Sequence, residues 1–164
     1  MSKIYADQFC DWLVEAGYTH CFFVSGGNIM HLLNSARKRF VCIPVVHEVA
    51  AGIAAEYFNE TSPEKKAFAM VTAGPGITNI VTAVAGAWLE SRELLVVAGQ
   101  VKSSDLSSTR IRQRGIQEVG GVAILSSITK SAVQIKKPLP KSKREFADRI
   151  STYFHWSFFL SDSA

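Results

Sequence analysis

Four short apolar segments, each followed by a turn and a helical pattern, constrain the fold of this chain more than any other feature. The segments are "HCFFVSGGN", "FVCIPVV", "AFAMVTAGPG" and "ELLVVAGQV", and apolar residues recur at helical spacing over residues 4–16, 28–39, 47–60 and 77–91. The last segment is almost continuously apolar, which is typical of a strand buried on both faces. This order predicts an α/β fold: a three-layer structure with a mostly parallel sheet and helices on both faces, in a single domain.

The pattern weakens after residue 101. The stretch "KSSDLSSTRIRQRGIQEVGG" is long and polar, and a loop of this length is usually functional or mobile. Residues 124–135 indicate the end of a helix and a fifth strand, and residues 142–154 indicate an amphipathic helix. The closing segment 155–164 carries aromatic side chains that we expect to be exposed.

Composition and charge exclude several classes of protein. Hydrophobic residues make up 48% of the 164, enough for one compact core, whereas charged residues make up only 20%, so we expect another chain to cover part of the surface. The cluster of Lys and Arg at 136–144 lacks interleaved aromatics, which favours a solvated helix face over a nucleic-acid site.

The spacing of the three cysteines does not match that of a metal site, so we expect Cys10, Cys21 and Cys42 to be buried thiols. Without a signal peptide or a membrane-length apolar run, we expect a cytoplasmic protein with no membrane partner.

The glycine turns and one carboxylate meet at the same edge of the predicted sheet. The carboxyl ends of parallel strands are where ligands gather, and the turns after three of the strands contain glycine. Gly74-Pro75-Gly76 could cradle an anion at a helix start, but it lacks the Lys and Ser/Thr of a phosphate loop and is equally a tight turn. Ser25-Gly26-Gly27 could likewise let a ligand approach the backbone closely, or it could merely turn the chain. His47 has no partner at metal spacing and is expected to be structural.

Glu48 is the most informative residue at this edge. It follows the second strand, begins a helix, and is followed by the small residues of "AAGIAA" instead of a basic partner. Such neighbours would partly desolvate the carboxylate, which could then share a proton with a ring nitrogen of a ligand. A helix-start carboxylate favoured by the helix dipole explains the position equally well. The residues alone leave both interpretations open.

Several motifs together resemble a known family. The segments "FFVSGGN", "VVHEVAAGIAAEYF", "VTAGPGITNIVTAVAGAWLESRELLVVAGQV" and "RGIQEV", in this order, are similar to the N-terminal pyrimidine-binding domain of thiamine-diphosphate enzymes. The similarity is greatest to the acetolactate synthase-like branch and the 2-oxo-acid decarboxylases, and it extends from about residue 3 to residue 150. It implies thiamine diphosphate as the cofactor and decarboxylation or carboligation of a 2-oxo acid as the reaction.

The resemblance assigns a catalytic role to Glu48. The matching glutamate of the family hydrogen-bonds N1′ of the cofactor's aminopyrimidine and thereby helps the ring to remove the proton at thiazolium C2. A cationic partner would spoil this proton sharing, and the small residues after Glu48 would leave room for a flat ring and a neighbouring chain.

The resemblance also implies roles for five other residues. Ser25, Gly26, Pro75 and Asn79 match positions beside the pyrimidine, and Gln117 matches a catalytic glutamine that faces the reacting centre. Ser25 departs from the pattern, because the synthases usually have proline there. No residue of this chain is expected to bind metal.

One part of the family pattern is absent from the chain. The family holds the diphosphate and Mg²⁺ through a second domain with a Gly-Asp-Gly motif, and this sequence contains no Gly-Asp-Gly. We therefore expect residues 1–150 to form the pyrimidine-binding domain and residues 151–164 to be an atypical tail, consistent with truncation and lacking the family's last strand. A separate subunit or paralogue would supply diphosphate and Mg²⁺ binding in a homo- or hetero-oligomer, and the chain would be inactive alone.

The sequence leaves two alternative functions open. A non-catalytic remnant could act as a dimerisation or interaction module. A nucleotide-binding regulator could use the same layered fold, although only fold analogy supports it.

Overall fold

The computed structural model describes residues 5–107, 111–135 and 155–161, the last of these by backbone only. The helices are α1 (Tyr5–Glu15), α2 (Met30–Ala36), α3 (Glu48–Thr61), α4 (Pro75–Leu89) and α5 (Gly121–Leu125), with short 3-10 turns η1 (Gly27–Ile29) and η2 (Ser103–Asp105). The strands are β1 (Tyr18–Phe23), β2 (Val41–Pro44), β3 (Lys66–Val71), β4 (Leu94–Gln100), β5 (Ser131–Ile135) and β6 (His155–Ser161). All strand pairs are parallel, in the order β2-β1-β3-β4-β6-β5.

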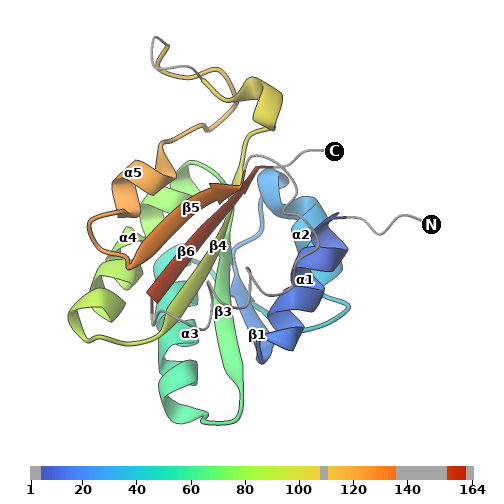
Figure 1. Cartoon of the computed structure of the whole chain (residues 1–164), viewed down its shortest axis with the longest axis vertical. Helices are drawn as coiled ribbons and strands as arrows, with labels where there is room; N and C mark the ends of the chain where they lie inside the picture. The colour runs from blue at the N-terminus through green and yellow to red at the C-terminus, as the bar shows by residue number, and fades with distance from the viewer. Residues whose placement is uncertain (1–4, 108–110, 136–154, 162–164) are drawn as a thin grey trace.

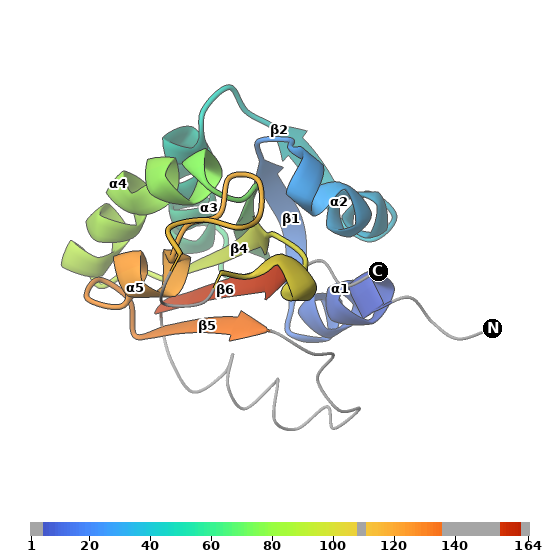
Figure 2. The same ribbon diagram turned by 90° about the horizontal axis from the view of Figure 1, so that it is seen from above.

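Helices cover both faces of this sheet, as the sequence predicts. Figures 1 and 2 show α1 and α2 on one face and α3, α4 and α5 on the other. Strand β3 faces both layers: Phe68 and Met70 belong to the core under α1 and α2, whereas Ala67, Ala69 and Val71 belong to the core under α3 and α4. Large side chains on one face and mostly small ones on the other therefore let α3 and α4 lie close to the sheet. All seven residues of β4 are buried, as expected for a strand covered on both sides.

The strand order creates a switch point beside β1. The chain runs from β1 to β2 on one side and then returns, through α3, to β3 on the other side of β1. In open α/β sheets, a crevice for ligands forms at the carboxyl ends of the strands where the order reverses in this way. The turns after β1, β2 and β3 all lie at this edge, which is the edge predicted from the sequence.

The C-terminal part of the chain differs from the expectation. The backbone of β6 pairs with β4 from His155 to Ser161 and with β5 on its other side, so β6 is an interior strand. Within the expected atypical tail 151–164, residues 155–161 thus form a strand of the sheet, while the domain division at residue 150 stays a prediction. The predicted helix at 142–154 and the basic cluster at 136–144 lie outside the described residues. Within the described part of the chain, no helix is long and apolar enough to cross a membrane.

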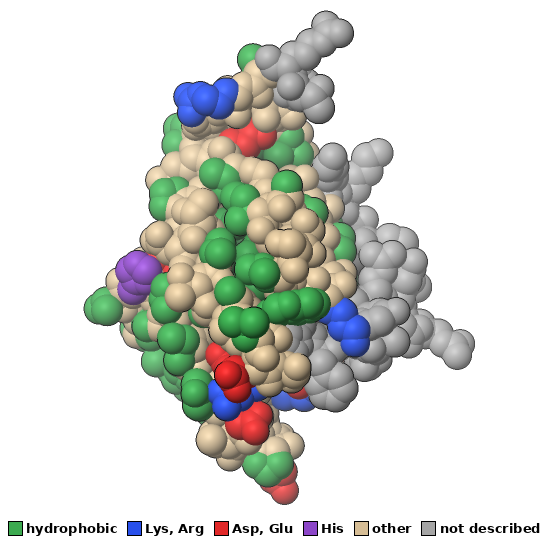
Figure 3. Space-filling model, turned by 90° about the vertical axis from the view of Figure 1, so that its left-hand side faces the viewer, with side chains coloured by type: hydrophobic (Ala, Val, Ile, Leu, Met, Phe, Trp, Pro, Cys, Tyr) green, Lys and Arg blue, Asp and Glu red, His purple; other side chains and the backbone are tan. Residues whose placement is uncertain are grey.

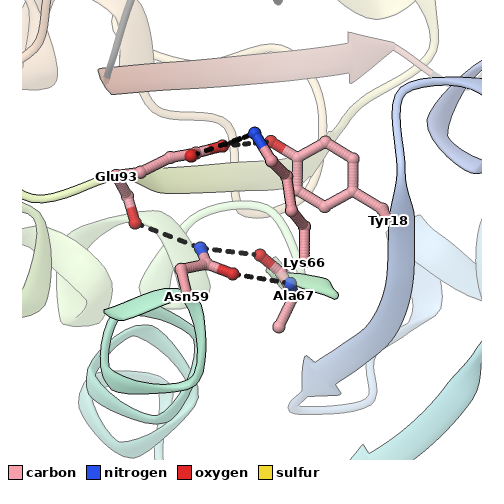
Figure 4. A network of polar contacts seen from close by, with 5 residues as sticks. All are labelled: Tyr18, Asn59, Lys66, Ala67 and Glu93. Atoms are coloured by element: carbon pink, nitrogen blue, oxygen red, sulfur yellow. Dashed lines mark hydrogen bonds and ion pairs between the residues drawn. The ribbon is translucent and has the colours of Figure 1, made fainter. Parts of the chain in front are cut away.

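A polar network fastens the amino-terminal ends of the central strands (Figure 4). The Asn59 side chain accepts a hydrogen bond from the backbone N–H of Ala67 (2.7 Å) and donates to the carbonyl oxygens of Ala67 and Glu93 (3.1 Å each). The Glu93 carboxylate accepts from Lys66 Nζ (3.0 and 3.1 Å) and from the Tyr18 hydroxyl (3.3 Å). This network joins α3 to β1, β3 and the start of β4 at the edge opposite the turns.

Replacing Asn59 by Ala should destabilise the fold. The substitution leaves three backbone groups without their partner, and an unsatisfied buried group costs about 1–3 kcal/mol. Urea unfolding of Asn59→Ala should show a loss in that range. The control Asn34→Ala removes an exposed amide and should change the free energy of unfolding by less than about 0.5 kcal/mol. Equal losses in the two variants would contradict a structural role for the Asn59 network.

Candidate functional site at the carboxyl edge of the sheet

The turn after β1 is pressed against the end of β3. A Cβ atom built on Gly26 would lie 2.4 Å from both Cβ and Oγ1 of Thr72, which is closer than such atoms can approach. The backbone of Gly26 is extended, so the position requires glycine for space and not for conformation. Any side chain at Gly26 would push the two turns apart. Ser25, the preceding residue, is exposed.

The turn after β3 is held against the polar loop by a second glycine. Gly74 has φ +60°, a conformation that L side chains rarely adopt, and a Cβ atom on it would lie 2.6 Å from the carbonyl oxygen of Gln117. Pro75 follows as the first residue of α4, where its missing N–H is not needed. The structure therefore places Gln117, which is exposed and has φ +59°, directly beside this turn.

Glu48 is buried at the start of α3 and has one polar partner. The residue is 7% exposed, and its Oε2 accepts a hydrogen bond of 2.9 Å from Nδ2 of Asn79 on α4. His47 caps the helix, because its Nδ1 accepts from the backbone N–H of Val49 at 3.2 Å. Within the described part of the chain, no basic side chain forms an ion pair with Glu48. The expected structural role of His47 is thus observed, and the carboxylate of Glu48 is not needed as the cap.

The small residues after Glu48 bring α3 and α4 together. A Cβ atom on Gly52 would lie 2.4 Å from Cβ of Ala83, and these two residues lie one helical turn beyond Glu48 and Asn79, respectively. Ala51 and Ala55 are fully buried in the core between the helices and the sheet. The expectation that this run leaves room for a neighbouring chain is therefore wrong for Ala51, Gly52 and Ala55. Their small size serves the approach of the two helices that joins Asn79 to Glu48.

Thr72 is a residue of this edge that the sequence analysis missed. Its Oγ1 is buried and has no hydrogen-bond partner among the described residues, although buried hydroxyls are normally paired. It lies in the turn after β3, against Gly26. Its position in the sequence, immediately after a buried strand and two residues before Gly74, could have indicated that Thr72 lies at this edge.

The polar loop is organised by Glu118, the residue after Gln117. Its carboxylate accepts four hydrogen bonds: from the backbone N–H (2.6 Å) and hydroxyl (2.8 Å) of Ser107 and from the backbone N–H groups of Arg114 (2.9 Å) and Gly115 (3.2 Å). Burial raises the pKa of Glu118, but these hydrogen bonds outweigh burial and lower its pKa to about 2. Glu118 is half-buried, and its side chain fastens the loop that carries Gln117.

A separate cleft of about 400 Å³ lies on the other side of this loop. Its lining includes Gln100, Arg112, Glu118 and Gln134. None of the six residues predicted for the site lines this cleft.

The structure brings together most of the six predicted residues at the carboxyl edge. Glu48 and Asn79 contact each other, Gly26 contacts Thr72, and Gln117 packs on the turn before Pro75, whereas Ser25 is exposed at the rim.

The hydrogen bonds to Glu118 make a prediction for pH dependence. Because the pKa of Glu118 is about 2 in the folded chain against an ordinary value of 4.5, its contribution to stability is complete above about pH 4.5 and disappears as the pH falls towards 2. Glu118→Gln should lower the melting temperature at pH 7, and its difference from wild type should shrink between pH 4.5 and 2. Glu64→Gln, which changes an exposed carboxylate, should have little effect at any pH. A difference for Glu118→Gln that is constant down to pH 2 would contradict the assigned hydrogen bonds.

Comparisons with known proteins agree with the fold. The family model "Thiamine pyrophosphate enzyme, N-terminal TPP binding domain" matches residues 4–124. The mitochondrial acetolactate synthase of Schizosaccharomyces pombe is 32% identical over 138 residues, which are 83% of this chain and 20% of that protein. Acetolactate synthase large subunits of Buchnera aphidicola and Lactococcus lactis are 32% and 35% identical over 127 residues, 76% of this chain and 21% of each relative. The chain thus spans about a fifth of these relatives, and it belongs to the N-terminal TPP-binding domain family of thiamine pyrophosphate enzymes.

Proposed function

We propose that this chain provides the pyrimidine-binding half of a thiamine-diphosphate enzyme that decarboxylates or joins 2-oxo acids, as an acetolactate synthase does. The observation that carries the proposal is the buried carboxylate of Glu48 at the switch point of the sheet, which has an amide partner and, among the described residues, no cationic one. A lone buried carboxylate is costly unless a group that can share a proton lies against it. The family match and the acetolactate synthase relatives support the same conclusion.

The residues at this edge fit an aminopyrimidine. A flat ring needs a surface to pack on and a group that can share a proton, which the exposed Pro75 of the turn after β3 and the carboxylate of Glu48 would supply. Ser25 would contact the ring from the exposed rim. When bound, thiamine diphosphate supplies a carbon nucleophile and an electron sink for 2-oxo acids. The diphosphate and Mg²⁺ would be held by another domain.

Glu48 and Asn79 have different roles at the ring nitrogen. Asn79 donates to Oε2 of Glu48 and thereby fixes the carboxylate in one orientation. With the cofactor bound, Glu48 would share a proton with N1′ of the ring, which is the role of a general acid–base with a positioned hydrogen bond. Gln117, beside the turn before Pro75, would face the reacting carbon from the loop that Glu118 fastens.

Exposed apolar side chains around the site support a partner at this edge. Met30 is 60% exposed, Val46 is 100% exposed and Ile116 is 83% exposed, and each lies in a segment that begins or packs at the carboxyl edge. Apolar side chains also gather on the face formed by α3, α4 and α5 (Figure 3), where Tyr57 and Leu89 are 50% and 79% exposed. Large exposed apolar surfaces mark protein interfaces. We assign this surface to a diphosphate- and Mg²⁺-binding domain in a cytoplasmic homo- or hetero-oligomer.

The proposed role of Glu48 can be tested by hydrogen–deuterium exchange at C2 of the cofactor in the enzyme assembled with its partner. Glu48→Gln keeps the side-chain shape and an acceptor for Asn79 but loses the carboxylate, so exchange should slow by about 10²–10⁴-fold. Glu60→Gln, an exposed glutamate on the same helix, should exchange at the wild-type rate.

Two outcomes would contradict this proposal in different ways. Exchange in Glu48→Gln at the wild-type rate would leave Glu48 as a helix-start carboxylate. If wild-type complex exchanges C2 no faster than free cofactor, the chain is an interaction module without catalytic function.

The isolated chain should bind thiamine diphosphate weakly. The contacts of this edge are made to the ring only, and the larger share of the affinity is expected from diphosphate and Mg²⁺ on the partner. Calorimetry of the purified chain should give a dissociation constant well above ~1 µM, which corresponds to about −8 kcal/mol. Binding at ~1 µM or tighter without a partner would show that this chain holds the diphosphate itself.

A further inference from the structure

Two of the three cysteines lie directly opposite each other on neighbouring strands. Cys21 of β1 and Cys42 of β2 are register partners in a parallel pair. Neighbouring strands lie about 4.8 Å apart, and disulfides join Cα atoms about 4.4–6.8 Å apart. Residues paired in register direct their side chains to the same face, and both cysteines pack in the core under α1 and α2. The backbone arrangement is thus compatible with a bond between the two sulfurs.

The two thiols differ in access and in acidity. Cys21 is fully buried, whereas Cys42 is half-buried on β2, an edge strand that has β1 as its neighbour in the sheet. The hydrogen bond donated by the Cys21 thiol lowers the pKa of Cys42, while burial raises the pKa of Cys21. Cys42 is therefore the accessible nucleophile and Cys21 the second thiol. Cys10 is fully buried, and burial raises its pKa to about 12.

We propose that Cys42 and Cys21 form a reversible oxidation site that reacts with a low-molecular-weight disulfide such as glutathione disulfide. The thiolate of Cys42 attacks one sulfur of the small disulfide, forms a mixed disulfide and releases one small thiolate. The Cys21 sulfur then attacks Cys42, forms the Cys21–Cys42 disulfide and expels the second small thiol, with the Cys21 proton passing to the leaving sulfur. Two protein thiols are oxidised and one small disulfide is reduced, so atoms and electrons balance.

The location of this pair connects it to the site at the carboxyl edge. Strand β1 leads to the turn at Gly26, and β2 leads to His47 and Glu48. A disulfide between them would fasten the edge strand to the interior of the sheet and limit the movement of Glu48 relative to Gly26. In a reducing cytosol such a bond is transient, which suits a redox-sensing role.

The test is equilibration of the full 164-residue chain in buffers of defined ratio of reduced glutathione to glutathione disulfide, with alkylation in acid and peptide mass spectrometry. Wild type should lose two alkylatable thiols and give a peptide pair joined through Cys21 and Cys42. Cys10→Ser should behave like wild type. Cys21→Ala should stop at the mixed disulfide, with one glutathione on Cys42, and Cys42→Ser should leave Cys21 reduced.

Three results would overturn the inference. These are a joined peptide pair that contains Cys10, oxidation of Cys21 in Cys42→Ser at the wild-type rate, and wild-type protein that keeps all its thiols in the most oxidising buffer. Should Cys21→Ala fail to fold, the wild-type peptide map alone decides between these results. The measurement does not involve thiamine diphosphate, so it stands or falls independently of the proposed function.

Discussion

The close approach of α3 and α4 is the contact on which the candidate site depends. Gly52 has no room for a side chain against Ala83, and the face of β3 beneath the helices carries Ala67 and Ala69. The helices are therefore near enough for Asn79 to reach Glu48 one turn earlier. A larger residue at Gly52 would separate the helices and remove the polar partner of the carboxylate. The small-residue helix thus explains the orientation of Glu48.

Stability and chemistry are divided between the two ends of the sheet. At the amino end, Asn59, Glu93 and Lys66 satisfy one another and the nearby backbone. At the carboxyl end, among the residues that the structure describes, the buried Oγ1 of Thr72 has no hydrogen-bond partner and Glu48 forms no ion pair. Groups left incompletely paired lower stability, and they are typical of places where a ligand completes the pairing. The hydrogen bonds and the ion pair at the opposite edge offset part of this loss of stability.

The sequence was most informative where one local pattern determined the structure. The period of apolar residues placed the first four strands and the helices between them, and the glycine turns and Glu48 were assigned to the correct edge. Packing between distant residues left no such pattern. The contact of Asn79 with Glu48 spans 31 positions, and the partners of Glu118 are largely backbone N–H groups, which every residue type except proline supplies. Strand β6 was missed because residues 151–164 were interpreted as an atypical tail, and its position between β4 and β5 is out of chain order.

Nitrogen NMR of cofactor labelled with ¹⁵N at N1′ can show whether Glu48 shares a proton with the pyrimidine ring. In the complex with the partner domain, the account predicts that the N1′ resonance moves from its free position towards that of a protonated ring. In Glu48→Gln, with the cofactor still bound, the resonance should return to the position of the neutral ring. An N1′ resonance that is the same in wild type and Glu48→Gln would contradict the account, because the carboxylate would then have no influence on that nitrogen.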